Sequence, residues 1–216
     1  MENLIMKDFS VWMALVDYLP VFLFAAASVF LMRDLYNKMS KGAFALFAAG
    51  TVDVIAAGFL KATYKLLYAL GVCDFESLSL VFFPLQSLGF LLAGIGMLAM
   101  LCHKQSKSTV AAVAPPLFTG TFLFVGLMVA GLGLMNAVLS ILCVKLKKPV
   151  LIVFFVIAFL CSLGMGYLSS RNFAEAAMNW IAEGVNTVGQ GALLTGAVLL
   201  HKNGFSALRL RGEEIG

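Results

Sequence analysis

Charged residues are scarce in this sequence: 12% of its 216 residues are Asp, Glu, Lys or Arg, whereas 62% are hydrophobic. In an ordinary soluble domain about one quarter of the residues are charged and just under half are apolar. The chain therefore lacks the polar surface that a water-soluble protein of this length needs. Its composition predicts an integral membrane protein with a single transmembrane domain over residues 1–216.

Cysteine and histidine are also scarce. The four cysteines, Cys73, Cys102, Cys143 and Cys161, show no CxxC spacing, so we expect neither a zinc site nor another cofactor. No GxSxG, HExxH or Walker motif is present, and the sequence favours a function other than catalysis. The basic residues are thinly spread, which excludes a nucleic-acid-binding surface.

Long apolar segments are what the sequence does contain. Crossing a bilayer as a helix takes about 20 residues. We expect an all-α membrane protein whose six transmembrane helices lie at 11–32, 43–70, 78–101, 117–143, 149–169 and 173–201.

Lysine and arginine divide nine to six between the two predicted sides of the membrane. Because positive residues concentrate on the cytoplasmic side, the count predicts that both termini are cytoplasmic. The expected location is a plasma membrane of the prokaryotic type.

A shift of 100 residues aligns two halves of the chain, 11–104 and 111–204. In this register Gln86-Ser87-Leu88-Gly89 matches Asn186-Thr187-Val188-Gly189. Three helices are an odd number, so the halves would have opposite orientations, as in the inverted repeats of many transporters. The alternative is that two helices resemble each other because tight packing favours small residues.

The same register places Pro84 opposite Gly184. Both residues weaken a helix locally, and broken helices commonly surround the central site of a transporter. We therefore expect helix breaks at these two positions, with simple packing as the alternative role.

The last apolar segment carries a stripe of polar side chains. At 100° per residue, its members fall within an arc of roughly 80°: Glu175, Asn179, Glu183, Asn186 and Gln190. Lipid does not satisfy such groups, so this face must meet protein, water or a ligand. One amide would simply hold helices together, whereas five aligned polar residues predict a cavity.

Other polar residues occur deep in the apolar segments. Asp53 is expected to act with Lys61 through an intervening group, or with Glu183 across a helix interface. Gln86 and Asn136 would complete the cavity lining, and Asp17 would contribute near one mouth. Lys65, in contrast, is expected to extend to the lipid headgroups.

These residues predict a small transporter, or the solute-binding subunit of a permease, for a small polar or cationic solute. Glu183 and Asp53 would carry charge or a proton and so couple transport to protons. The amides of Gln86, Asn136, Asn179, Asn186 and Gln190 would orient the solute. The expected partners are the lipid bilayer, the solute or protons, and a second copy of the chain or another membrane subunit.

Three alternatives remain open at this stage. An ion channel would need a continuous wet path in place of an occluded pocket. An intramembrane lipid-modifying enzyme would need Asp53 and Glu183 clustered at headgroup level. A membrane sensor or assembly subunit would use the polar stripe to pair with another chain.

Overall fold

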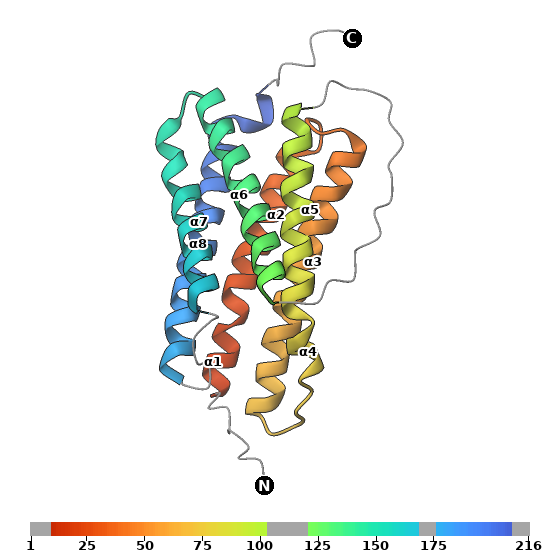
Figure 1. Ribbon diagram of the computed structural model, residues 1–216. Helices are drawn as coiled ribbons and strands as arrows, with labels where there is room; N and C mark the ends of the chain where they lie inside the picture. The colour runs from red at the N-terminus through yellow and green to blue at the C-terminus, as the bar shows by residue number, and fades with distance from the viewer. Residues whose placement is uncertain (1–9, 103–120, 169–175, 209–216) are drawn as a thin grey trace.

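The computed structural model describes residues 10–102, 121–168 and 176–208, and this part of the chain is helical without strands. Figure 1 shows the helices side by side in one bundle. They are α1 (Val11–Val16), α2 (Tyr18–Leu35), α3 (Lys41–Ala69), α4 (Ser77–Leu80), α5 (Phe82–Cys102), α6 (Thr121–Lys145), α7 (Ile152–Leu168) and α8 (Ala176–Lys202), with short 3₁₀ turns η1 (Pro149–Leu151) and η2 (Phe205–Ala207).

Five helical stretches of the described chain are long and apolar enough to cross a membrane: Val11–Leu35, Lys41–Ala69, Ser77–Leu101, Leu123–Lys145 and Pro149–Leu168. The sixth long helix, α8, has 27 residues but a lower mean hydropathy because of its polar stripe. The six predicted helices are thus confirmed in order and approximate position. That they cross a membrane stays a prediction.

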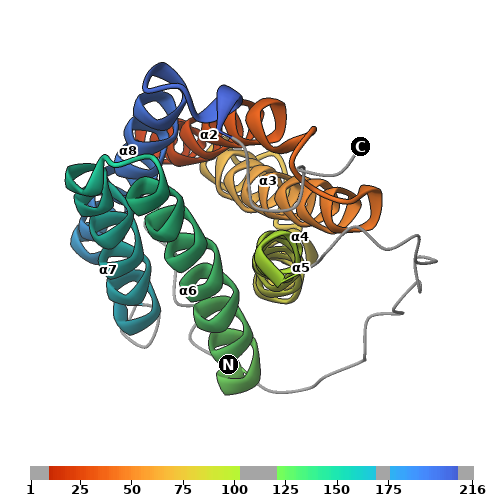
Figure 2. The ribbon, with the colours of Figure 1, turned by 90° about the horizontal axis from the view of Figure 1, so that it is seen from above.

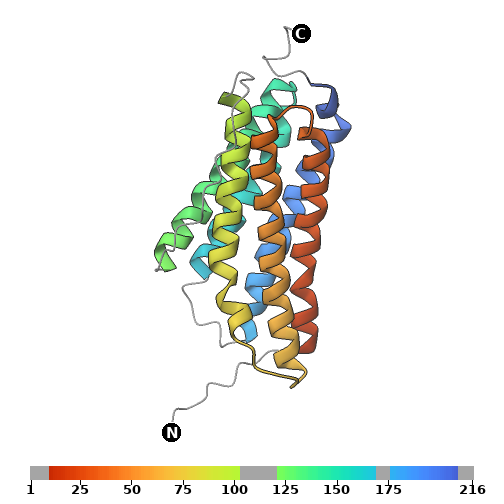
Figure 3. The ribbon, with the colours of Figure 1, turned by 90° about the vertical axis from the view of Figure 1, so that its right-hand side faces the viewer.

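The six long helices follow one another around the bundle in the order α2, α3, α5, α6, α7 and α8 (Figure 2). Each packs against the next in this order, and α8 closes the ring against α2. The side view in Figure 3 shows α2, α3 and α5 next to one another. The ring therefore brings α2 and α8, the first and the last of the six long helices, into contact.

Glycines set the closest helix contacts and reveal the direction of each pair. On α5, Gly89 lies against Gly50 of α3 and Gly96 lies against Phe47, so residue numbers run in opposite directions and the pair is antiparallel. Between α5 and α6, Gly131 lies against Phe90 and Leu134 against Gly94, so the numbers rise together. The helices α5 and α6 are therefore parallel.

The parallel pair overturns the predicted inverted repeat. Because α5 and α6 run the same way, α2, α3 and α5 have the same directions as α6, α7 and α8 (Figure 1). The inversion assumed that the chain stays on one side between the two halves. Instead, α5 ends and α6 begins at opposite ends of the bundle. In the described part of the chain, α1 and η2 lie at opposite ends of the bundle (Figure 1); the predicted side of the two termini concerns residues outside the described ranges and stays a prediction.

Prolines break two of the helices. The ring of Pro20 clashes with the carbonyl of Val16 and offers that carbonyl no donor, and α1 ends at Val16. In the same way α4 ends at Leu80, four residues before Pro84. One expected break therefore lies near Pro84, whereas the break expected at Gly184 is absent because α8 is continuous.

The apolar core fills only one half of the bundle. Large, fully buried side chains such as Met97, Leu139, Phe155 and Leu200 gather toward the end where α2 and α8 finish. In the other half, many buried residues are small or polar, including Ala57, Ala62 and Ala182. The candidate site lies in this second half.

Candidate functional site

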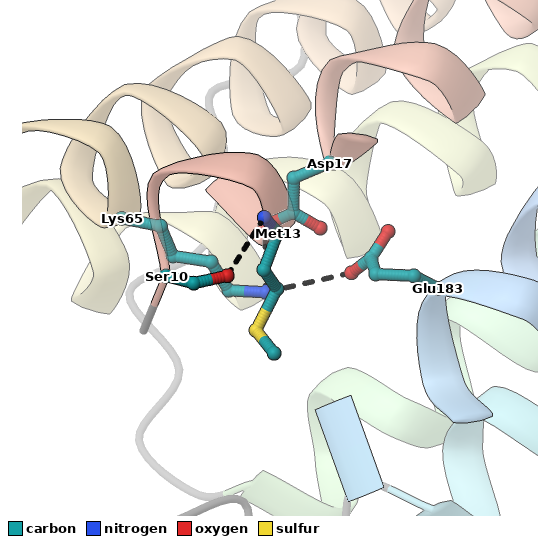
Figure 4. A network of polar contacts seen from close by, with 5 residues as sticks. All are labelled: Ser10, Met13, Asp17, Lys65 and Glu183. Atoms are coloured by element: carbon teal, nitrogen blue, oxygen red, sulfur yellow. Dashed lines mark hydrogen bonds and ion pairs between the residues drawn. The ribbon is translucent and has the colours of Figure 1, made fainter. Parts of the chain in front are cut away.

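Three ionisable side chains meet in the polar half of the bundle (Figure 4). Lys65 Nζ, on α3, lies 2.6 Å from Oδ2 of Asp17 and 3.4 Å from Oε1 of Glu183 on α8. The exposed fractions are 6% for Asp17, 5% for Lys65 and 2% for Glu183. Buried charges are costly unless they are paired, so the ammonium between two carboxyl groups is what makes this cluster tolerable. We call these three residues the triad.

The break at Pro20 positions the first member of the triad. Asp17 follows the last residue of α1 and precedes the first residue of α2, so its carboxyl lies at the positive end of the α2 dipole. Ser10 stabilises the start of α1, since its Oγ accepts a hydrogen bond of 3.2 Å from Met13 N. The short helix α1 thereby holds Asp17 at the inner face of the bundle.

The triad holds more acid than base. Lys65 donates a hydrogen bond to Glu183 and forms an ion pair with Asp17. Oδ2 of Asp17 and Oε2 of Glu183 have no hydrogen-bond partner within the described chain. Figure 4 shows the two carboxyl groups facing each other. A proton on one of them would remove the excess negative charge and supply the missing donor.

A small cavity, lined by Asp17 of the triad, lies between α2, α3, α5 and α8. Its volume, measured as the space that the centres of water molecules can occupy, is about 40 Å³, enough for a few waters or one small solute. Its polar lining comes from Asp17, Lys61, Gln86, Asn186 and Gln190, and its apolar lining includes Pro20, Phe24, Val54, Phe82 and Phe90. The cavity thus lies beside both proline breaks.

Lys61 carries the cavity's second charge. Its Nζ lies 4.5 Å from the centre of the Phe82 ring, a distance at which an ammonium is attracted to the face of an aromatic ring. Phe82 is the first residue of α5, directly after the break before Pro84. Within the described residues, Lys61 Nζ has no hydrogen bond and no ion pair. Taken together, Lys61 and the triad contain two acids and two bases.

The amides on α8 and α5 face the same cavity. Gln190 Nε2 donates a hydrogen bond of 3.4 Å to Oδ1 of Asn186, whereas Oε1 of Gln190 is buried without a partner in the described part. Gln86 lines the opposite wall. These groups have unused hydrogen-bonding capacity, which is what orients a polar solute in a pocket.

The structure brings together most of the predicted site. Glu183, Asn186, Gln190, Gln86 and Lys61 lie in or beside the cavity. Asn179 is buried on α8, at 2% exposure, one turn before Glu183. The first member of the stripe, Glu175, lies outside the described residues.

Asp53 and Asn136 do not join this site. Asp53 is half-buried on α3 and lies against Gly89 of α5; it does not line the cavity, and no described contact links it to Lys61 or Glu183. Asn136 is buried on α6, where its Nδ2 donates to the carbonyl of Leu132 one turn earlier. Its Oδ1 is buried without a hydrogen-bond partner in the described part of the chain, and Asn136 does not line the cavity.

Sequence reasoning misjudged two members of the triad. Lys65 was expected to extend to lipid headgroups, but its ammonium is buried between two acids, because α1 and α8 close over this end of α3. Asp17 was expected only at a mouth of the cavity. A signal for Asp17 was present: it stands three residues before Pro20, where the proline interrupts the helix and bends the chain.

A second buried pair joins α2 to α8 at the opposite end of the bundle. His201 Nδ1 lies 2.8 Å from Oδ1 of Asp34 and 3.1 Å from Oδ2. Asp34 is only 4% exposed. Next to it, Lys38 Nζ donates a hydrogen bond of 2.8 Å to the carbonyl of Ser206.

Within the described ranges, no group of three or more His, Cys, Asp or Glu side chains is arranged to hold a metal ion. A comparison with protein families, curated proteins and solved structures finds no match to this chain. Function is therefore argued from the site itself.

Proposed function

We propose that this protein is an integral membrane transporter of a small polar solute, coupled to protons through the triad of Asp17, Lys65 and Glu183. The observation that carries the proposal is the buried triad beside a polar cavity. Support also comes from the helices, since five of them are long and apolar enough to cross a membrane. In such a setting, buried ionisable groups typically mark a proton or substrate pathway.

The triad suits proton coupling because its charge is unbalanced. With every group ionised, the two carboxylates and one ammonium carry a net charge of −1. Uptake of one proton by the carboxyl pair makes the triad neutral, and its release restores the charge. A buried group that changes charge in this way favours different conformations in its two states.

The broken helices suit a conformational cycle. The cavity lies beside the breaks at Pro20 and Pro84, where α1 meets α2 and α4 meets α5. Interrupted helices surround the solute site in many transporters. In the proposed cycle, the half made of α2, α3 and α5 rocks against the half made of α6, α7 and α8.

The test is a flux assay with the purified protein in liposomes under an imposed pH gradient. A panel of labelled methylammonium, urea and nitrate covers the cationic, neutral and anionic classes of small solute. We expect the gradient to drive accumulation of one class, and Glu183→Gln to abolish the stimulation by the gradient.

Asp53→Asn is the matched control, because it removes an acid of α3 that lies outside the cavity. It should transport like the unmodified protein. The proposal fails if Glu183→Gln, correctly folded, keeps the full response to the gradient. It also fails if the liposomes show an unselective current instead of solute accumulation, which is the behaviour of a channel.

A further inference from the structure

The acids of the polar stripe suggest a cationic ligand, but the cavity also contains the positive charge of Lys61. Asp17 and Glu183 both contact Lys65, so each acid already has an ammonium in direct contact. Lys61 supplies the charge that balances the second acid, but its ammonium has no described hydrogen bond or ion pair, only the ring of Phe82 at 4.5 Å. The cavity therefore offers a ligand an ammonium whose hydrogen-bond donors are unused within the described residues.

We propose that the cavity binds a small monovalent oxyanion, such as a short carboxylate, through Lys61, and that one proton enters the triad for each anion bound. This inference rests on the proposed transport function and names its solute class. It replaces the cationic solute that the acids of the sequence first favoured.

The rest of the lining fits such an anion. The amide nitrogens of Gln86 and Asn186 supply hydrogen-bond donors beside Lys61, and neutral donors stabilise an anion without adding charge. A volume of about 40 Å³ accommodates an ion of only a few heavy atoms. The apolar wall formed by Val54, Phe24 and Phe90 excludes water from the far side and leaves room for a hydrogen or a methyl group.

Charge balance explains the accompanying proton. With all four side chains ionised, Asp17, Glu183, Lys61 and Lys65 sum to zero, so an added anion would leave a buried net charge of −1. No other described charge faces Glu183: α5 and α7 contain no Asp, Glu, Lys or Arg. Arg33 and Asp34 lie in the last turn of α2 and Lys41 is the first residue of α3, far along the helices from Asp17 and Lys65, and Asp53 does not line the cavity.

A proton on the carboxyl pair restores neutrality at the smallest structural cost, because the pair already lacks a donor. The anion and the proton then cross together without net movement of charge. The prediction is electroneutral symport with a ratio of one proton to one anion.

Binding to the purified full-length protein tests the anion site directly. Sodium nitrate and sodium formate are titrated calorimetrically in a sodium gluconate background, with methylammonium gluconate and urea as cationic and neutral comparisons. We expect saturable binding of nitrate and formate only. Formate binding without nitrate binding would identify the site as one for carboxylates, and nitrate alone as one for inorganic oxyanions; both results support the oxyanion class.

Substitutions assign the anion to Lys61. Lys61→Met should weaken binding at least tenfold, whereas Lys61→Arg, which keeps the charge, should bind within a few-fold of the unmodified protein. Lys202→Met removes an exposed lysine at the end of α8 and should have no effect. Unchanged binding in Lys61→Met, or equal loss in Lys202→Met, would overturn the assignment.

Proton uptake tests the coupling in weakly buffered solution with a pH indicator. About one proton should be taken up per anion bound, and Glu183→Gln should bind the anion without this uptake. Anion binding with no proton uptake by the unmodified protein overturns the coupling.

The two proposals fail in different ways. If methylammonium or urea binds and both anions do not, the solute class is wrong while transport stands. If nitrate and formate bind but no solute crosses the liposome membrane, the transport function is wrong while the anion site stands.

Discussion

The two ends of the α2–α8 interface stabilise a buried acid in different ways. Each end holds a buried acid of the stretch Val11–Leu35, Asp17 at one end and Asp34 at the other, and each acid contacts a lysine or histidine side chain. At the Asp34 end, one histidine serves one acid at 2.8 Å, and the surroundings are the packed apolar core. At the Asp17 end, one lysine serves two acids, and a cavity adjoins them.

The two groups differ in the ratio of acids to bases: the Asp34–His201 pair has one of each, whereas the triad has two acids and one base. The Asp34–His201 pair joins one acid to one histidine, and neither residue lines the cavity. The triad has one acid in excess, and two carboxyl oxygens without hydrogen-bond partners among the described residues. An unsatisfied buried polar group costs free energy, and under the proposed function the excess acid is the group that takes up the proton.

The largest effect is expected when the triad loses its only base. Lys65→Met leaves two buried carboxyl groups without the ammonium that contacts them, and breaking a buried ion pair in this way costs about 3–5 kcal/mol. The free energy of unfolding, measured by denaturant titration in detergent, should fall by this amount. Lys202→Met is the control. A fall no larger than in the control would mean that the triad has no role in stability.

The next effect is expected at the balanced end. Asp34→Asn weakens the hydrogen bond to His201, and a bond to a charged group contributes about 1.5–3 kcal/mol. The free energy of unfolding should fall by this amount, while the response of solute flux to a pH gradient should persist. Loss of that response in a folded Asp34→Asn protein would remove the distinction between the two ends.

A smaller effect is expected beside the Asp34–His201 pair. Lys38→Met removes the hydrogen bond to the carbonyl of Ser206 and the ammonium 5.7 Å from the centre of the Phe205 ring. A single hydrogen bond contributes about 0.5–1.5 kcal/mol net, and the same titration should show a loss of this size. A loss in the free energy of unfolding larger than in Asp34→Asn would mean that Lys38 stabilises this end of the bundle more than Asp34 does.

The smallest effect on stability is expected from Glu183→Gln. The amide keeps an acceptor for Lys65, and removal of one charge relieves the repulsion between Glu183 and Asp17, so the two changes offset each other to within about 0.5 kcal/mol. The same acid-to-amide change thus costs little at the triad and much at Asp34. Equal losses in the two variants would show that the triad holds no excess acid.

Much of the fold was predictable because it depends on local patterns. The six long helices follow from apolar runs, and the breaks after Val16 and Leu80 follow from prolines four residues later. The polar stripe on α8 correctly indicated an inward face, since Asn179 and Glu183 are buried and Asn186 and Gln190 line the cavity.

The predictions that failed concern partners and directions. Asp53 looked like the natural companion of Glu183, yet it lies on another side of α3, while Lys65 occupies the position next to Glu183. A helical wheel shows which residues share a face but not which helix covers that face. The inverted repeat failed for a similar reason: hydropathy locates a helix without giving its direction.

The sequence by itself determined where helices form, where they break, and that one face of α8 must avoid lipid, because these properties depend on hydropathy, helical period and proline geometry within a few residues. Only the tertiary structure decided that Lys65 contacts Glu183, 118 residues further along the chain, and that His201 contacts Asp34 across 167 residues. It also decided that α5 and α6 run in parallel. These outcomes depend on how glycines let distant helices approach, and on which buried charges then find one another.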